Sequence, residues 1–165
     1  MTKQNKNEFE TIVKDILINN KFKNLDSELH HGISRAGHCM RVAKNTYYIT
    51  KKLHLDYVKA TRAALLHDFY EKEDLHSKNS VKALSDHPHV ALENASKFYN
   101  LSTLEENIIE SHMFPFGHAL PKHTESWIVS LVDKTVALYE MYRYKISLVL
   151  GIYIIFLFNI ITIQR

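Results

Sequence analysis

Apolar side chains recur every three or four residues along most of the chain, which is the spacing of one face of an α-helix. The pattern first predicts an amphipathic helix from Phe9 to about Asn19. No segment alternates between apolar and polar residues as a half-buried strand does. The pattern therefore predicts an all-α fold. The same spacing predicts five further helices, over 35–53, 57–67, 87–98, 103–112 and 124–139.

Polar residues mark several of the expected helix ends. Asp56 can accept hydrogen bonds from the free amides of the helix that follows it, and either Ser85 or Asp86 could cap the helix after 86. Ser102 and Glu105 have the spacing of a capping box. Segments without helical periodicity are expected to form a connection at 19–32 and loops at 71–79 and 113–123.

The C-terminal part of the chain is strongly apolar. Thr124 starts the last core helix, which is expected to run through Trp127, Val129, Leu131, Val132, Val136 and Tyr139. Beyond it, residues 146–163 carry no charge, and about 18 residues is the lower range for a membrane span. One interpretation is a membrane anchor that leaves the preceding domain in the cytoplasm. The other is a buried terminal helix that closes the core, or an oligomer interface.

Composition limits the class of protein. A chain of 165 residues fits one domain, and we expect an N-terminal helix and connection at 1–29, a main domain at 30–145 and an apolar helix at 146–165. The single cysteine, Cys39, cannot form an intrachain disulfide, which fits a reducing compartment. A net charge of +3 is too small and too dispersed to indicate nucleic-acid binding.

Histidine is the compositional outlier, with 11 copies, and several lie near aspartates in the sequence. His38 is followed by the pair His67-Asp68 and, far downstream, by Asp133. Taken singly, each has an ordinary structural explanation as a hydrogen-bonded core residue or a helix cap. Together they offer the imidazole and carboxylate ligands that suit transition metals. Further candidate ligands are His87, with His89 as its rival, and His112, with His118 and His123 as its rivals.

The order and context of these residues resemble the HD superfamily of metal-dependent phosphohydrolases, and the resemblance covers roughly 32–144. It implies a helical-bundle domain in which His38, His67, Asp68 and Asp133 bind a metal. In the subset with six ligands, the places of two further histidines are taken by His87 and His112. That subset implies two divalent ions (Mn, Fe, Zn, Ni or Co), and Asp68 can bridge them because a carboxylate has two oxygens. The Gly-Tyr-Pro signature of the HD-GYP phosphodiesterases is absent, which argues against cyclic dinucleotide cleavage.

Such a site suits hydrolysis of a nucleotide or another small phosphoester by a metal-activated hydroxide, with Asp68 as the central catalytic residue. Arg41, one turn from His38, and Lys134, next to Asp133, could each reach a substrate phosphate. Phe69 and Tyr70 could stack on a base. Two alternatives remain at this point. The same ligands could hold two irons in an oxygenase, or the chain could be a metal or nucleotide sensor without catalytic activity.

Overall fold

The computed structural model describes residues 2–26, 29–30, 33–75 and 80–163, and describes only the backbone at 29, 30, 33, 80, 81 and 151–163. Over these residues the regular secondary structure is helical except for β1 (Leu29–His30) and β2 (Ile33–Ser34), a short antiparallel pair. The all-α prediction is confirmed. The helices are α1 (Lys3–Ile18), α2 (Asn20–Asn24), α3 (Arg35–Lys52), α4 (Tyr57–Leu66), the 3-10 turn η1 (Lys72–Asp74), α5 (Ser80–Ser96), α6 (Thr103–Ser111) and α7 (Thr124–Ile163).

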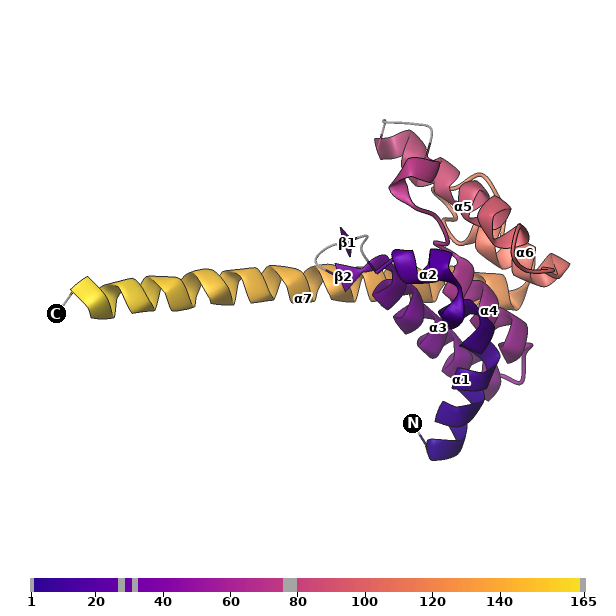
Figure 1. Ribbon diagram of the computed structural model, residues 1–165, viewed down its shortest axis with the longest axis horizontal. Helices are drawn as coiled ribbons and strands as arrows, with labels where there is room; N and C mark the ends of the chain where they lie inside the picture. Colours follow the sequence, from indigo (N-terminus) through magenta and orange to yellow (C-terminus); the bar gives the residue numbers. More distant parts are fainter. Residues whose placement is uncertain (1, 27–28, 31–32, 76–79, 164–165) are drawn as a thin grey trace.

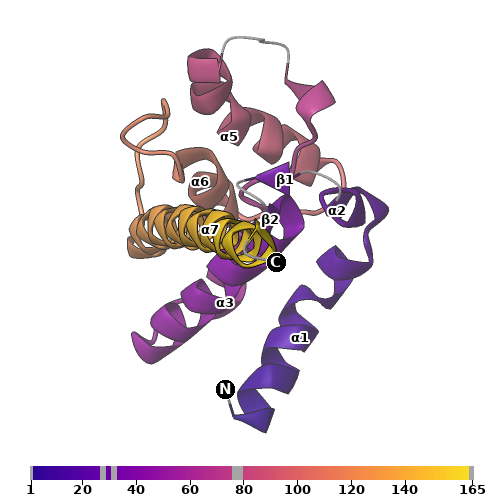
Figure 2. The ribbon, with the colours of Figure 1, turned by 90° about the vertical axis from the view of Figure 1, so that its left-hand side faces the viewer.

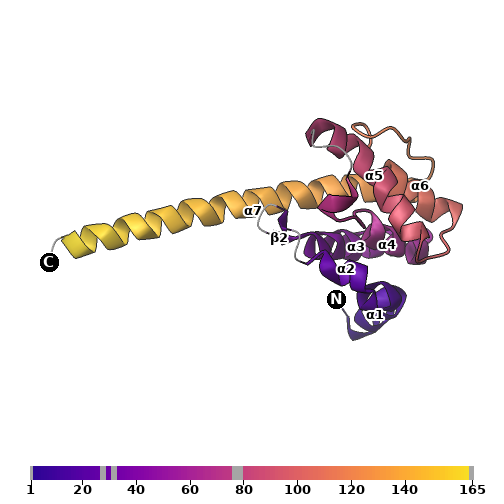
Figure 3. The same ribbon diagram turned by 45° about the horizontal axis from the view of Figure 1, so that its top comes forward.

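Helix α4 is the centre of the bundle and packs against α1, α3, α6 and α7 (Figures 1 and 3). Figure 2, in which α7 points toward the viewer, shows α3 and α6 beside that helix. Ala60, Ala63 and Ala64 are fully buried on it. Because alanine side chains are short, the neighbouring helices can approach closely and bury the larger Leu65 and Leu66 at its end. The last turn of α4 is therefore enclosed by several other helices, and His67 and Asp68 follow directly after it.

Helix α1 begins earlier than its apolar pattern indicates. It starts at Lys3, where the Thr2 side chain accepts a hydrogen bond from the Asn5 amide. Glu8 belongs to this polar segment, and its carboxylate accepts hydrogen bonds from the hydroxyls of Tyr47 and Tyr57, both at 2.7 Å. The expected connection at 19–32 also contains a short helix, α2, whose N-cap is Asn19.

The predicted caps are right for two helices and wrong for one. Asp56 accepts from the Lys59 amide at the start of α4, and Ser102 and Glu105 form the capping box of α6. Helix α5, however, starts at Ser80, so neither Ser85 nor Asp86 caps it. Proline is commonest in the first turn of a helix, which makes a start beside Pro88 the simplest interpretation. The structure instead places Pro88 inside α5.

The last core helix and the apolar tail form one continuous helix, α7, whose C-terminal part projects away from the other helices (Figures 1 and 3). Of the residues expected in its core face, Val129, Val132 and Val136 are buried, whereas Trp127, Leu131 and Tyr139 are exposed. The buried face of α7 is mixed, because beside the valines it carries four polar residues, Ser126, Ser130, Asp133 and Glu140.

The prediction for the apolar tail at 146–163 falls largely on residues whose side chains lie outside the description. Where side chains are described, Leu148, Val149 and Leu150 are exposed, so this part of α7 does not close the core. Within the described part of the chain, no helix has the length and apolar character needed to cross a membrane. The anchor interpretation therefore gains no support, and the oligomer interface stays a prediction.

Candidate metal centre

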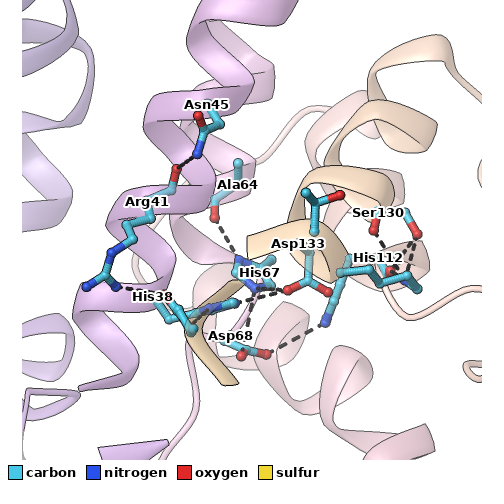
Figure 4. Close-up of polar contacts among 12 residues, drawn as sticks. His38, Arg41, Asn45, Ala64, His67, Asp68, His112, Ser130 and Asp133 are labelled. Carbon is cyan, nitrogen blue, oxygen red and sulfur yellow. Dashed lines mark hydrogen bonds and ion pairs between the residues drawn. The ribbon is translucent and has the colours of Figure 1, made fainter. Parts of the chain in front are cut away.

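Six side chains from five helical segments meet in the middle of the bundle, and Figure 4 shows several of them converging. Their ligand atoms fall into three groups, within each of which the atoms lie within 4.8 Å of one another: His38 with His67 and Asp68, His67 with His112 and Asp133, and Asp68 with His87 and His112. These are the six residues that the sequence selected as metal ligands. The structure therefore brings the whole candidate set together.

The ends of two helices fix two of the histidines. His67 follows α4 and His112 follows α6, each as the C-cap residue. The last carbonyls of a helix have no partner within it. Each ring uses one of them, because Nδ1 of His67 lies 2.7 Å from the Ala64 oxygen and Nδ1 of His112 lies 2.7 Å from the Ile109 oxygen. With Nδ1 engaged in this way, Nε2 of each ring is directed at the centre.

Asp68 lies between two sets of histidines. Its Oδ1 is 3.3 Å from Nε2 of His87 and 3.6 Å from Nε2 of His112. Its Oδ2 faces the other way, 3.8 Å from Nε2 of His67. Asp133 belongs to this second side, since its Oδ1 lies 3.0 Å from Nε2 of His38 and 3.5 Å from Nε2 of His67.

The donor set fits a cation. Nε2 of His67 and Oδ1 of Asp68 are buried and, among the described residues, have no hydrogen-bond partner. Leaving a buried polar atom unpaired costs about 1–3 kcal/mol, so native structures seldom do so without a reason. Both atoms are lone-pair donors that point into one centre. A divalent transition metal is the partner that imidazole nitrogen and carboxylate oxygen together suit best.

The buried carboxylates of the centre are ionised and are stabilised by positive charge beside them. Burial opposes the charged form of Asp68, but His67, His87 and His112 hold its pKa well below the usual range. Burial likewise opposes a proton on His38, yet hydrogen bonds to Asp133 and Glu140 raise its pKa to about 10. The pKa of His67 is also raised despite its burial, by Asp68 first, so in the absence of a metal the protons on His38 and His67 offset the charge of the carboxylates. A metal ion that binds the same atoms takes the place of these protons.

His112 is neutral at physiological pH. Its burial, together with the nearby His67 and His87, lowers its pKa to about 3. A neutral imidazole is the form that binds metals. The Asp68 side chain is 19% exposed, whereas that of His67 is completely buried.

The two cations expected at the substrate both have partners within the protein. Arg41 donates to the Glu140 carboxylate at 2.7 Å and to the Gly37 carbonyl at 3.3 Å. Lys134 donates to the His112 carbonyl at 2.8 Å and to the Ser130 hydroxyl at 2.9 Å. Both side chains therefore support residues of the centre. A role in binding the substrate stays a prediction for each.

The two expected aromatic contacts lie in different environments. Phe69 is fully buried and packs edge-on against Phe98 and Tyr99, so its ring is part of the core. Tyr70 lies beside the centre, with its ring centroid 5.2 Å from that of His87. The guanidinium of Arg35, on α3, lies 3.9 Å from the ring centroid of Tyr70 and donates to the Tyr70 carbonyl.

The rival histidines lie outside the centre. His89 is on α5 but is 66% exposed and pairs with Glu93. His118 is 83% exposed and lies 3.8 Å from Asp86, and His123 is also exposed. The buried His87 and His112, at 5% and 1% exposure, are the histidines that reach the centre.

Sequence reasoning did not single out Glu140. This residue is 2% exposed, and its Oε2 lies 2.9 Å from Nδ1 of His38. Burial raises the pKa of a carboxyl, but here the contacts with His38 and Arg41 lower it. One signal was present in the sequence, because Glu140 lies seven residues after Asp133, and residues two turns apart share a helix face.

Fold and centre together define an all-α metal-binding domain of the phosphohydrolase type. The family model described as "HD domain" matches residues 35–138, which include all six ligands, and the chain belongs to this family. The HD domain places the chain in the superfamily of metal-dependent phosphohydrolases, whose domains bind divalent metals.

Among proteins of assigned function, the chain is similar to ribonuclease Y of Malacoplasma penetrans (strain HF-2), with 34% identity over 100 residues. The aligned part covers 61% of this chain and 19% of that protein, so the chain spans only a small part of its relative. No solved structure shows a significant match to the chain.

Proposed function

We propose that this chain is a hydrolase of phosphoesters, with a nucleotide or another small phosphorylated molecule as its substrate and two divalent metal ions as its cofactor. The observation that carries the proposal is the position of Asp68. One of its oxygens faces His87 and His112, and the other faces His67. A carboxylate shared between two groups of nitrogen ligands is the arrangement that a dinuclear centre needs.

We assign different ligands to each of the two ions. His38, His67 and Asp133 would complete one side of Asp68, and His87 and His112 the other. Bound divalent ions lower the pKa of a water ligand and polarise a phosphoryl oxygen, and these are the two requirements of phosphoester hydrolysis. The protein contributes fixed ring orientations, through the Nδ1 hydrogen bonds of His67 and His112, and a carboxylate edge that solvent and substrate can reach.

The similarity to ribonuclease Y supports a phosphodiester among the substrates to be tested. The net charge of +3 is too small to favour a long nucleic acid as the substrate on electrostatic grounds. We therefore expect a mononucleotide or a short oligonucleotide to be cleaved faster than a long RNA.

A purified chain with measured metal content tests the proposal. The metal-loaded protein should release product from at least one of p-nitrophenyl phosphate, bis-p-nitrophenyl phosphate, a panel of nucleotides and a short single-stranded RNA. The metal-free protein and an Asp68→Ala variant serve as controls. A protein that binds metal but cleaves none of these substrates would favour the sensor alternative. A coloured, iron-rich protein that consumes oxygen would favour the oxygenase alternative.

A further inference from the structure

His38 differs from the other three histidines of the centre in the group that faces its Nδ1 nitrogen. Nδ1 of His67, His87 and His112 faces a backbone carbonyl three or four residues earlier, at 2.7, 3.3 and 2.7 Å respectively. Nδ1 of His38 instead lies 2.9 Å from the carboxylate of Glu140, which is on a different helix. His38 therefore depends on a distant part of the chain for its orientation.

The position of His38 in α3 explains this difference. It lies near the start of the helix, where the amides rather than the carbonyls lack partners within the helix. His67 and His112, by contrast, follow the ends of their helices and face carbonyls that lack partners within the helix. For His38 the acceptor comes from α7.

Helix α7 contacts both nitrogens of the His38 ring. Asp133 approaches Nε2 at 3.0 Å and Glu140 approaches Nδ1 at 2.9 Å. The two acids lie two helical turns apart on one face of α7, which is the spacing needed to hold one ring between them. The carboxylate of Glu140 is buried, and its other oxygen accepts from Arg41 at 2.7 Å.

We propose that Glu140 is a positioning residue of the metal centre, which accepts the Nδ1 proton of His38 and so presents the Nε2 lone pair of that ring to the metal. An ionised carboxylate can only accept a hydrogen bond, so its contact with Nδ1 fixes which nitrogen carries the proton. A charged acceptor also makes the imidazole a stronger ligand than a carbonyl acceptor does. Arg41 holds the carboxylate in place from the surface.

The match to the family model does not assign this role, because the matched residues end at 138, before Glu140. The inference rests on metal binding, which is part of the proposed function, but it does not require hydrolysis. Metal affinity is therefore the property to measure.

The test compares Zn²⁺ affinity of the full chain and of Glu140→Gln by competition with a chromophoric chelator. Removal of such an outer partner typically costs 10–100-fold in metal affinity, and we expect a loss of about this size. Asp15→Asn is the matched control. Asp15 on α1 forms an ion pair with Arg62 on α4, with nitrogen–oxygen distances of 2.6 and 2.8 Å. Its Zn²⁺ affinity should equal that of the wild type.

A second readout separates positioning from general stabilisation. In the Zn²⁺-loaded wild type, the His38 Nδ1 proton should resonate far downfield and exchange slowly with water, and in Glu140→Gln it should move upfield and exchange faster. Arg41→Gln keeps the Glu140 carboxylate but removes its contact with Arg41, so this variant should lose less Zn²⁺ affinity than Glu140→Gln. If Glu140→Gln does not fold, the loss of affinity in Arg41→Gln still tests the inference. Unchanged affinity and an unmoved proton in Glu140→Gln would overturn the inference alone. A wild-type chain that binds no Zn²⁺ would contradict the metal centre as well.

Discussion

The Nε2 atoms of His87 and His112 lie 3.0 Å apart in the interior of the domain. On the far side of each ring, Nδ1 faces a backbone carbonyl, of Ala83 in one case and of Ile109 in the other. A carbonyl oxygen can only accept, so a ring that binds metal through Nε2 keeps its proton on Nδ1 and turns the Nε2 lone pair toward the other ring. Two such lone pairs at this distance need a cation between them, either a proton or a metal ion. This contact is the basis for a second metal ion.

The first prediction concerns metal stoichiometry. We expect two equivalents of Zn²⁺ per wild-type chain, and one in His87→Gln, because His87 belongs to the group formed with Asp68 and His112 and leaves the other ligands in place. Elemental analysis of protein purified without chelator or affinity-tag histidines measures this directly. The matched control is His89→Gln, two residues away on the same helix, whose exposed side chain lies outside the centre. Two equivalents in both variants would contradict the assignment of His87.

The second prediction concerns Asp68. The variant Asp68→Ala removes the carboxylate that faces both groups of histidines, so metal binding and hydrolysis should be lost together. Metal content and product release are measured on the same preparation. Asp86→Ala, at a more exposed carboxylate on α5, should retain both. Full activity in Asp68→Ala would rule out the proposed mechanism.

The third prediction separates two roles for Lys134. Its half-buried ammonium donates to the His112 carbonyl and to Ser130, so Lys134→Met should lower the free energy of unfolding by about 1–3 kcal/mol. Urea unfolding of the metal-free protein, followed by circular dichroism, measures the loss. Lys122→Met, at an exposed lysine in the neighbouring loop, should leave stability unchanged. If Lys134→Met kept full stability and only raised KM, the lysine would instead contact substrate.

The fold was predictable from the sequence to a large extent because most helices have an apolar face toward the core. Helix α7 was a partial exception. Its buried face carries Ser126, Ser130, Asp133 and Glu140 as well as three valines, whereas Leu131, on another face, is exposed. Hydrophobic periodicity identifies a buried face only where that face is apolar. On α7 it identified the helix and the buried Val129, Val132 and Val136, but it also placed the exposed Trp127, Leu131 and Tyr139 in the core.

The candidate ligands were predicted from their order in the chain and from the family resemblance, since spacing in sequence does not establish contact in space. The partners of those ligands were not predictable in the same way. Glu140 carries no motif, and its role depends on where α7 crosses α3 beside His38. Arg41 looked like a free cation because the sequence does not reveal that Glu140 lies within hydrogen-bonding distance of it.

The fourth prediction concerns acid stability and depends on Glu8, far from the metal centre. The Glu8 carboxylate accepts from Lys51, Tyr47 and Tyr57, in that order of effect, and these contacts lower its pKa from 4.5 to about 2. A group whose pKa is lower in the folded state stabilises the fold above its unfolded pKa, and this contribution is lost as the pH falls toward the folded pKa. The stabilisation from Glu8 should therefore be complete above about pH 5 and should fade between pH 4.5 and pH 2.

The variant Glu8→Gln isolates this effect because glutamine does not titrate. The metal-free wild type should be more stable than Glu8→Gln at pH 6, and the difference in unfolding free energy should shrink steadily as the pH is lowered through 4 and 3. Urea unfolding at each pH provides the measurement. Glu10→Gln is the control, since Glu10 is exposed and only approaches Lys6 at 3.9 Å, and its difference from wild type should stay small at every pH. A constant difference between Glu8→Gln and the wild type across this range would show that the tyrosine and lysine contacts do not hold Glu8 in its ionised form.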